Sequence, residues 1–140
     1  MKVKNVVFAA RKANVFDFET PSHTYLLKGG LISHNTQEMY SKDVVSGGCL
    51  VEGEAIQMFD GSLVEIQNIH VGDMVNTLDG PKLVTHTWTP ETLEFGEPEC
   101  YEVEFEDGST VKCSNHHPFL IGDEWVDAED LQVGDIAKVG

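Results

Sequence analysis

Apolar and polar residues alternate over several short stretches of this chain, with the period of two that is typical of β-strands. The clearest stretch is 100–105 (CYEVEF), where apolar side chains line one face and glutamates fall on the other. Similar patterns occur at 3–8, 14–19, 63–66 and 82–88. Helical patterns are weak, and only 128–131 (AEDL) suggests about one turn. The sequence therefore predicts an all-β fold.

Turn residues separate these stretches. Asp-Gly pairs occur at 60–61, 79–80 and 107–108. A glycine with positive φ can close a hairpin at such a position, because it has no Cβ to clash with the backbone. We therefore expect a β-hairpin at each of the three pairs.

A short internal repeat adds to this pattern. The run NIHVGDMV at 68–75 is matched by DLQVGDIA at 130–137, at a fixed offset of 62. Two unrelated turns that enter strands would also contain Gly-Asp. We favour the alternative, in which the fold has two pseudo-symmetric β-halves.

Length and composition limit the possible classes of protein. A chain of 140 residues, 41% of them hydrophobic, can bury the core of a single domain that spans 1–140. No apolar run approaches the roughly 18 residues of a membrane span, and no signal peptide is evident at the start. The three cysteines have no C-x-x-C spacing, which argues against a zinc site or a disulfide framework. We therefore expect no metal, no other cofactor and no membrane as a partner.

The net charge of -15 is unevenly distributed. Residues 1–35 carry five basic and two acidic side chains, a net charge of +3, whereas 49–140 carry three lysines and twenty acids, a net charge of -17. Such acidity excludes nucleic acid as a partner. The asymmetry is either chance clustering on a solvated surface or the mark of two separate chains that associate by electrostatic steering. The segment between them, 36–48, is polar and ends in Ser-Gly-Gly, which is typical of a linker.

At each end of this linker lies a residue that could attack the neighbouring backbone carbonyl. Asn35 follows a histidine and precedes Thr36, so its carboxamide can attack its own backbone carbonyl and break the bond to Thr36. Cys49 follows Gly48, and its thiol can attack the Gly48 carbonyl to form a thioester. Because Cys49 must be a free thiol to react, a reducing, cytoplasmic setting is the natural expectation.

Four motifs resemble those of inteins, the self-splicing members of the Hedgehog/intein (Hint) superfamily. They are CLVEGEAI at 49–56, KCSNHHPFL at 112–120, VFDFETPSHTYLL at 15–27 and GLISHN at 30–35. The first is similar to the family's opening motif and the last to its terminal motif. The resemblance implies a Hint fold, a flattened horseshoe of strands with pseudo-two-fold symmetry and a central cleft. The terminal motif comes first here, so the fold would be circularly permuted.

The resemblance also assigns roles in the first step, an N-to-S acyl shift at Gly48–Cys49. The 112–120 motif resembles the family's Thr-x-x-His block, with Ser114 in the place of threonine and His117 as the histidine. His117 would protonate the departing amide nitrogen as a general acid. Ser114 would hold that ring or the scissile carbonyl, and Asp17 would deprotonate Cys49.

The later steps would use the other junction. Thr36 would attack the Gly48 thioester to give an oxygen ester. Asn35 would then cyclise, while His34 and His23 protonate the leaving nitrogen and polarise the carbonyl. An O-to-N shift would restore an amide.

The permuted order defines three segments and their partners. Residues 1–35 would be the C-intein part, 36–48 an extein-derived linker, and 49–140 the N-intein part. Splicing would ligate the flanking extein residues, which here would cyclise 36–48 and leave 1–35 bound to 49–140. The order looks like that of an engineered split intein whose parts are joined in reverse, with Met1 and Gly140 close together in space. The expected partners are the complementary fragment and the extein host protein.

Three other classes share some of these residues. A Hedgehog-like autoprocessing domain would use Cys49 and His117 but has no role for His34 and Asn35. A Cys/His hydrolase would turn over external substrates. A charge-driven association module of the two fragments would carry out no chemistry.

Overall fold

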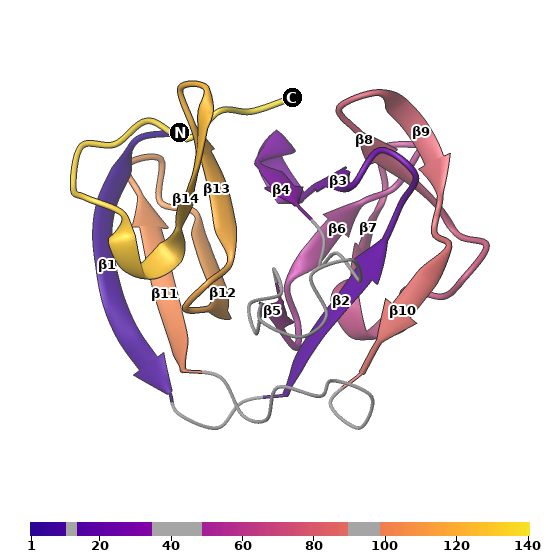
Figure 1. The fold of residues 1–140 in the computed structure, drawn as a ribbon, viewed down its shortest axis with the longest axis horizontal. Coiled ribbons are helices and arrows are strands. Elements are labelled where there is room, and N and C mark those ends of the chain that lie inside the picture. Colours follow the sequence, from indigo (N-terminus) through magenta and orange to yellow (C-terminus); the bar gives the residue numbers. More distant parts are fainter. Residues whose placement is uncertain (11–13, 35–48, 90–98) are drawn as a thin grey trace.

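The computed structural model describes residues 1–10, 14–34, 49–89 and 99–140 (Figure 1). These residues form an all-β architecture of several antiparallel sheets, with short 3-10 turns and no α-helix in the described ranges. The prediction of the all-β class is confirmed. Within the same ranges, no helix has both the length and the apolar character that a membrane crossing needs.

The largest sheet has the strand order β1-β11-β12-β5-β2-β10. Its strands are β1 (Val3–Ala10), β11 (Cys100–Phe105), β12 (Thr110–Ser114), β5 (Leu50–Val51), β2 (Val15–Glu19) and β10 (His86–Trp88). A second sheet has the order β14-β13-β4-β3. Its strands are β14 (Glu124–Asp127), β13 (Pro118–Ile121), β4 (Ile32–His34) and β3 (Thr24–Leu26).

Two further hairpins and three 3-10 turns complete the described part of the fold. The hairpins pair β6 (Ala55–Gln57) with β7 (Leu63–Glu65) and β8 (Met74–Thr77) with β9 (Gly80–Leu83). The turns are η1 (Lys28–Gly30), η3 (Ile66–Asn68) and η4 (Ala128–Asp130). The last of these confirms the weak helical pattern at 128–131.

The predicted hairpin turns are confirmed. Gly61, Gly80 and Gly108 have φ values of 87°, 90° and 91°. Gly61 and Gly108 lie in the β6–β7 and β11–β12 connections, and Gly80 is the first residue of β9, directly after the turn from β8. The stretch 82–88, predicted as one strand, is instead divided between β9 and β10. The division arises because β9 pairs with β8 whereas β10 pairs with β2. Between them, Val84 is buried and its amide donates to the carbonyl of Asp73.

The internal repeat is confirmed as local structure. The His70 amide donates to the Asp73 carboxylate at 2.9 Å, and the Gln132 amide makes the same bond to Asp135, also at 2.9 Å. The glycine before each aspartate has nearly the same φ, 96° at Gly72 and 97° in the second copy. The equivalence extends upstream, because β7 and η3 precede the first copy as β14 and η4 precede the second.

The first 34 residues are interleaved with the rest of the chain (Figure 1). Strand β1 pairs with β11, β2 lies between β5 and β10, and β4 pairs with β13. The main hydrophobic core joins side chains from both segments, among them Phe18, Tyr25, Phe105 and Phe119. The segment 1–34 therefore supplies strands to both of the larger sheets.

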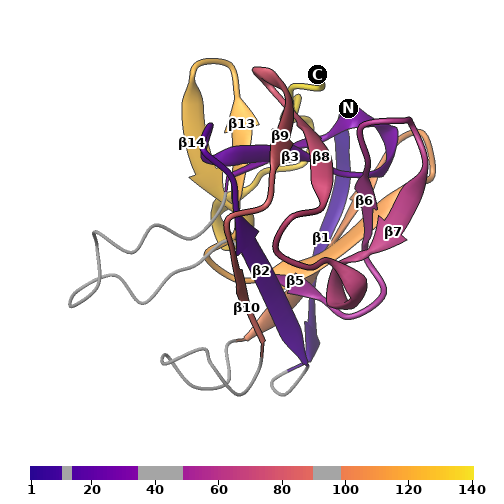
Figure 2. The same ribbon diagram turned by 90° about the vertical axis from the view of Figure 1, so that its right-hand side faces the viewer.

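The chain ends lie close together, as the permuted order predicts. The Met1 ammonium group donates to the Ala137 carbonyl at 2.7 Å, and Leu31 forms a β-bridge with Val139. Both views of the fold show the two ends at the same end of the molecule (Figures 1 and 2).

Candidate active site

The structure describes six of the predicted site residues: Asp17, His23, His34, Cys49, Ser114 and His117. Asn35, Thr36 and Gly48 lie outside the described residues. The description of the site is therefore built on the six, together with the side chains that contact them.

Cys49 occupies the position just before β5, where it is fully buried. Its amide donates to the Ser114 hydroxyl at 3.3 Å, and its carbonyl accepts the Ser114 amide at 2.9 Å. The amide nitrogen of Cys49 is the leaving group of the predicted acyl shift. The Ser114 hydroxyl therefore contacts this nitrogen. The scissile carbonyl, which Ser114 was also predicted to hold, belongs to Gly48 and lies outside the described residues.

Asp17 belongs to β2, which pairs with β5 on the edge opposite β12. Val15 pairs with Val51 and Phe16 with Leu50 in the β2–β5 ladder, so one further step of this antiparallel register places Asp17 opposite Cys49. Residues directly opposite one another share a face of the sheet. A row that runs across the largest sheet thus presents Ser114, Cys49 and Asp17 to the same side.

His117 lies between β12 and β13, directly after a turn that begins at Ser114 of this row. The amide of His117 donates to the Ser114 carbonyl at 3.0 Å, which closes the turn. Its ring is fully buried, packs against the Phe119 ring with centroids 5.1 Å apart, and places Nε2 2.9 Å from the Ser33 hydroxyl. The neighbouring His116 instead lies at the surface, where its Nδ1 is 3.1 Å from the Asp127 carboxylate.

Two buried residues that the sequence analysis did not single out, Tyr25 and Ser33, each contact one of these groups. The Tyr25 hydroxyl donates to Asp17 Oδ1 at 3.0 Å, and Tyr25 lies opposite Ser33 in the β3–β4 ladder. Burial raises the pKa of Tyr25 well above its ordinary value, and the charge of Asp17 raises it further, while a side-chain hydrogen bond with Ser33 lowers it. The sequence held one signal for these two site residues. Ser33, directly before His34, is a polar residue in an otherwise apolar run.

His23 and His34 form a second group. Their rings are nearly parallel, with an interplanar angle of 15° and centroids 6.3 Å apart, and the Trp125 ring packs edge-on against His34 at 5.1 Å. His23 has a φ of 63°, which is unusual for a residue other than glycine. Its buried Nδ1 has no hydrogen-bond partner among the described residues. His34 directly precedes Asn35, the residue whose cyclisation the two rings are predicted to assist.

The other cysteines are buried, as expected for small apolar side chains. Burial raises the pKa of Cys100, and burial together with the charge of Glu54 raises the pKa of Cys113 well above its ordinary value. Cys113 belongs to the main core, whereas Cys49 packs with Val15 and Cys100 in a separate buried cluster. This separation argues against a disulfide between Cys49 and Cys113.

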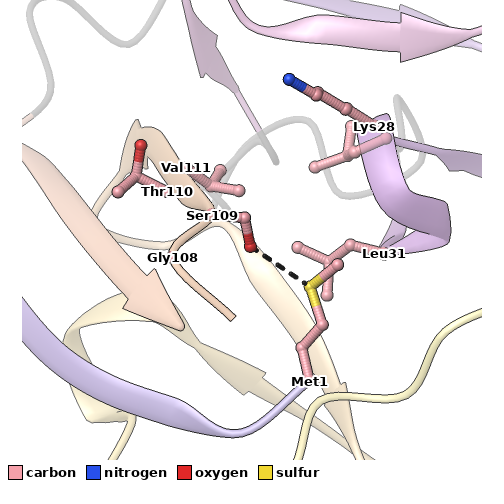
Figure 3. Close-up of a pocket in the computed structure, with 8 residues that line it drawn as sticks. Met1, Lys28, Leu31, Gly108, Ser109, Thr110 and Val111 are labelled. Atoms are coloured by element: carbon pink, nitrogen blue, oxygen red, sulfur yellow. Dashed lines mark hydrogen bonds between the residues drawn. The ribbon is translucent and has the colours of Figure 1, made fainter. Parts of the chain in front are cut away.

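Two other features of the described residues were considered as binding sites. His116, Asp127 and Glu129 bring ligand atoms within 4.8 Å of one another, and these side chains could hold a cation, but His116 Nδ1 already lies 3.1 Å from Asp127 and 3.5 Å from Glu129 at the surface. A pocket of about 220 Å³ next to Met1 contains none of the predicted site residues (Figure 3). Its lining consists of Met1, Leu27, Lys28, Leu31, Gly108, Ser109, Thr110 and Val111.

Comparison with known proteins does not assign the chain. No protein-family profile matches it, and no curated protein sequence matches it. The function must therefore be argued from the chemistry of the site itself.

Proposed function

We propose that this chain is a circularly permuted intein of the Hint fold, which splices once rather than turning over as an enzyme. The observation that carries the proposal is the environment of Cys49. Its amide nitrogen contacts Ser114, and the buried His117 follows in the same turn, while the register of β2 and β5 places Asp17 opposite.

The first step needs a proton removed from sulfur and a proton delivered to nitrogen. Asp17 would take the Cys49 thiol proton, and the thiolate would attack the Gly48 carbonyl. The new C–S bond forms as the C–N bond breaks, and the departing amide nitrogen takes its proton from His117. The buried setting strengthens each of these charge interactions, because water does not screen them.

The later steps would release the linker. Thr36 would take the acyl group from Cys49, Asn35 would cyclise beside His34 and His23, and the linker 36–48 would leave as a cyclic peptide. The fragments 1–35 and 49–140 would stay associated through their shared sheets. A reducing, cytoplasmic compartment belongs to the same proposal, since oxidation of Cys49 would block the first step.

A second candidate is a charge-driven association module of the two fragments. Lys2 lies 3.6 Å from Glu106 and Lys4 lies 3.9 Å from Glu104, and both pairs join segment 1–34 to the acidic remainder. Exposed pairs of this kind contribute little stability. They support steering between the fragments, which is compatible with splicing as well.

Mass spectrometry of freshly purified protein tests the proposal. Splicing predicts three products: 1–35, 49–140 and a cyclic peptide of residues 36–48. A hydrolase or an association module predicts an intact chain, and a Hedgehog-like domain predicts cleavage at Gly48–Cys49 without cleavage after Asn35. In Cys49→Ala, thioester formation should be lost while Asn35 cyclisation still cuts before Thr36. Thiol-induced cleavage at Gly48–Cys49 in that variant would contradict the assignment of Cys49.

A further inference from the structure

We infer that His116, Asp127 and Glu129 form a binding site for a divalent transition-metal cation such as Zn²⁺. The site lies between β12 and β13 and at the start of η4. It goes beyond the proposed splicing function and does not depend on it. It uses no cysteine, unlike the zinc sites that the spacing of the three cysteines argues against. All three side chains are partly exposed, so a cation can reach them from solvent.

The spacing of the ligand atoms fits a first-row metal ion. His116 Nδ1 lies 3.1 Å from Asp127 Oδ2 and 3.5 Å from Glu129 Oε1, and ligand atoms of all three residues lie within 4.8 Å of one another. Zinc binds such nitrogen and oxygen atoms at about 2.0–2.2 Å, so two ligands of a tetrahedral ion lie about 3.3–3.6 Å apart. A cation between these atoms would therefore require only small side-chain rotations.

Hydrogen bonds hold the ligands in place. The Glu129 amide donates to the Asn115 carbonyl at 3.1 Å, directly beside His116 in the chain. Asn115 Nδ2 also donates to Glu129 Oε2 at 3.2 Å, while Oε1 is the oxygen that faces His116. Carboxylates that bind metals are commonly oriented by a second hydrogen bond of this kind. Asp127 is fixed by its pairing with Pro118 in the β13–β14 ladder, so the site is largely formed before a cation binds.

The charges at the site also favour a cation. Nδ1 of His116 faces two carboxylates, which when ionised can only accept a hydrogen bond, so this nitrogen carries a proton. A metal ion would take the place of that proton. A neutral ring would move the proton to Nε2, and a charged ring would release it. The two carboxylates would balance the charge of a divalent ion, and the excess of acids over lysines in 49–140 would attract it.

The ligand set selects among cations. Imidazole suits zinc, nickel and copper, whereas magnesium and calcium prefer oxygen ligands. We therefore expect Zn²⁺ to bind and Mg²⁺ not to compete with it. A bound ion would tie the residues before His117 to η4. Because it would bind the folded state, it should raise the temperature of thermal denaturation.

The first test is isothermal titration calorimetry with zinc chloride on the full chain carrying Asn35→Ala and Cys49→Ala, which removes the proposed reaction and the reactive thiol. Adding His116→Ala or Glu129→Gln should weaken binding at least about tenfold, because loss of a residue that merely orients a ligand already costs about 10–100-fold. An excess of Mg²⁺ should leave the affinity of the starting chain unchanged.

Two matched controls separate the site from general attraction of cations. His70→Ala removes another exposed histidine, and Asp123→Asn removes one acidic charge at the other end of the β13–β14 hairpin. Both should bind zinc as tightly as the starting chain. Zinc should also raise the denaturation temperature of the starting chain and of both controls, but not that of His116→Ala.

Nuclear magnetic resonance would locate the ion. The ring resonances of His116 should shift on addition of zinc before those of His70. Three results would each overturn the inference: no zinc binding by the starting chain, equal affinity in the site variants and the controls, or His116 resonances that do not move. None of these measurements involves cleavage, so failure of the proposed function would appear separately, as a chain that does not splice.

Discussion

The adjacent residues His116 and His117 offer a sharp test of the mechanism, because they have the same side chain in opposite environments. His117 is buried and follows the turn that starts at Ser114, and His116 is 39% exposed and paired with Asp127. We predict that His117→Ala slows thiol-induced cleavage at Gly48–Cys49 by about 10²–10⁴-fold, the usual contribution of a positioned general acid. This corresponds to about 3–5 kcal/mol on the activation barrier.

The structure also gives the size of the side effects. His117→Ala empties a fully buried position and removes the partner of Ser33, which should cost roughly 2–4 kcal/mol of folding free energy. His116→Ala removes contacts with two acidic side chains at the surface and should cost about 0.2–1 kcal/mol. Cleavage rates should therefore be compared only under conditions where urea denaturation shows that each variant is folded.

The assay is the rate of cleavage in the presence of dithiothreitol, followed by mass spectrometry in chains that carry Asn35→Ala. His116→Ala should stay close to the rate of the starting chain. If His116→Ala is the slower variant, or if folded His117→Ala cleaves at the starting rate, then His117 is not the general acid and the proposed role of Ser114 fails with it.

Two other predictions concern stability and assembly. Burial raises the pKa of Glu54 to about 7, so the folded state holds a proton that the unfolded state loses near pH 4.5. The free energy of unfolding should therefore fall by about 1–3 kcal/mol as pH rises from 4.5 to about 7. Urea denaturation measured across this pH range should show the fall in the starting chain and not in Glu54→Gln. A fall that persists in Glu54→Gln would contradict the prediction. Separately expressed 1–35 and 49–140 should associate with an on-rate that drops steeply as salt rises. Stopped-flow mixing should show a weaker salt dependence with Lys2→Ala and Lys4→Ala, and a salt-independent rate would leave strand pairing as the driving force.

Local sequence carried enough information to predict some elements well. The alternation at 100–105 and the Asp-Gly turns depend on residues close together in the chain, and both appear as predicted. The division of 82–88 into β9 and β10 was not predictable in this way. It depends on which distant strand each half pairs with.

The same limit applies to the site. Motifs pointed to Cys49 and His117 individually, but the contact of Ser114 with the Cys49 amide follows from the pairing of strands that are far apart in the chain. The sequence did not predict Tyr25 and Ser33 as site residues, because a tyrosine and a serine in a strand are usually packing residues. Only the tertiary structure shows that Tyr25 contacts Asp17 and that Ser33 contacts His117. The roles of Asn35 and Thr36 stay predictions.

The interleaving of segment 1–34 with the remainder has a consequence for timing. Asp17 belongs to β2 and Ser114 to β12, far apart in the chain, yet the β2–β5 register places Asp17 opposite Cys49 and Ser114 contacts the Cys49 amide. Under the proposed function, a ribosome would have to release both β2 and β12 before the site could form, and a chain that lacked β12 would hold Cys49 without Ser114. The proposed reaction of Cys49 would in this sense wait until β12 has paired with β5.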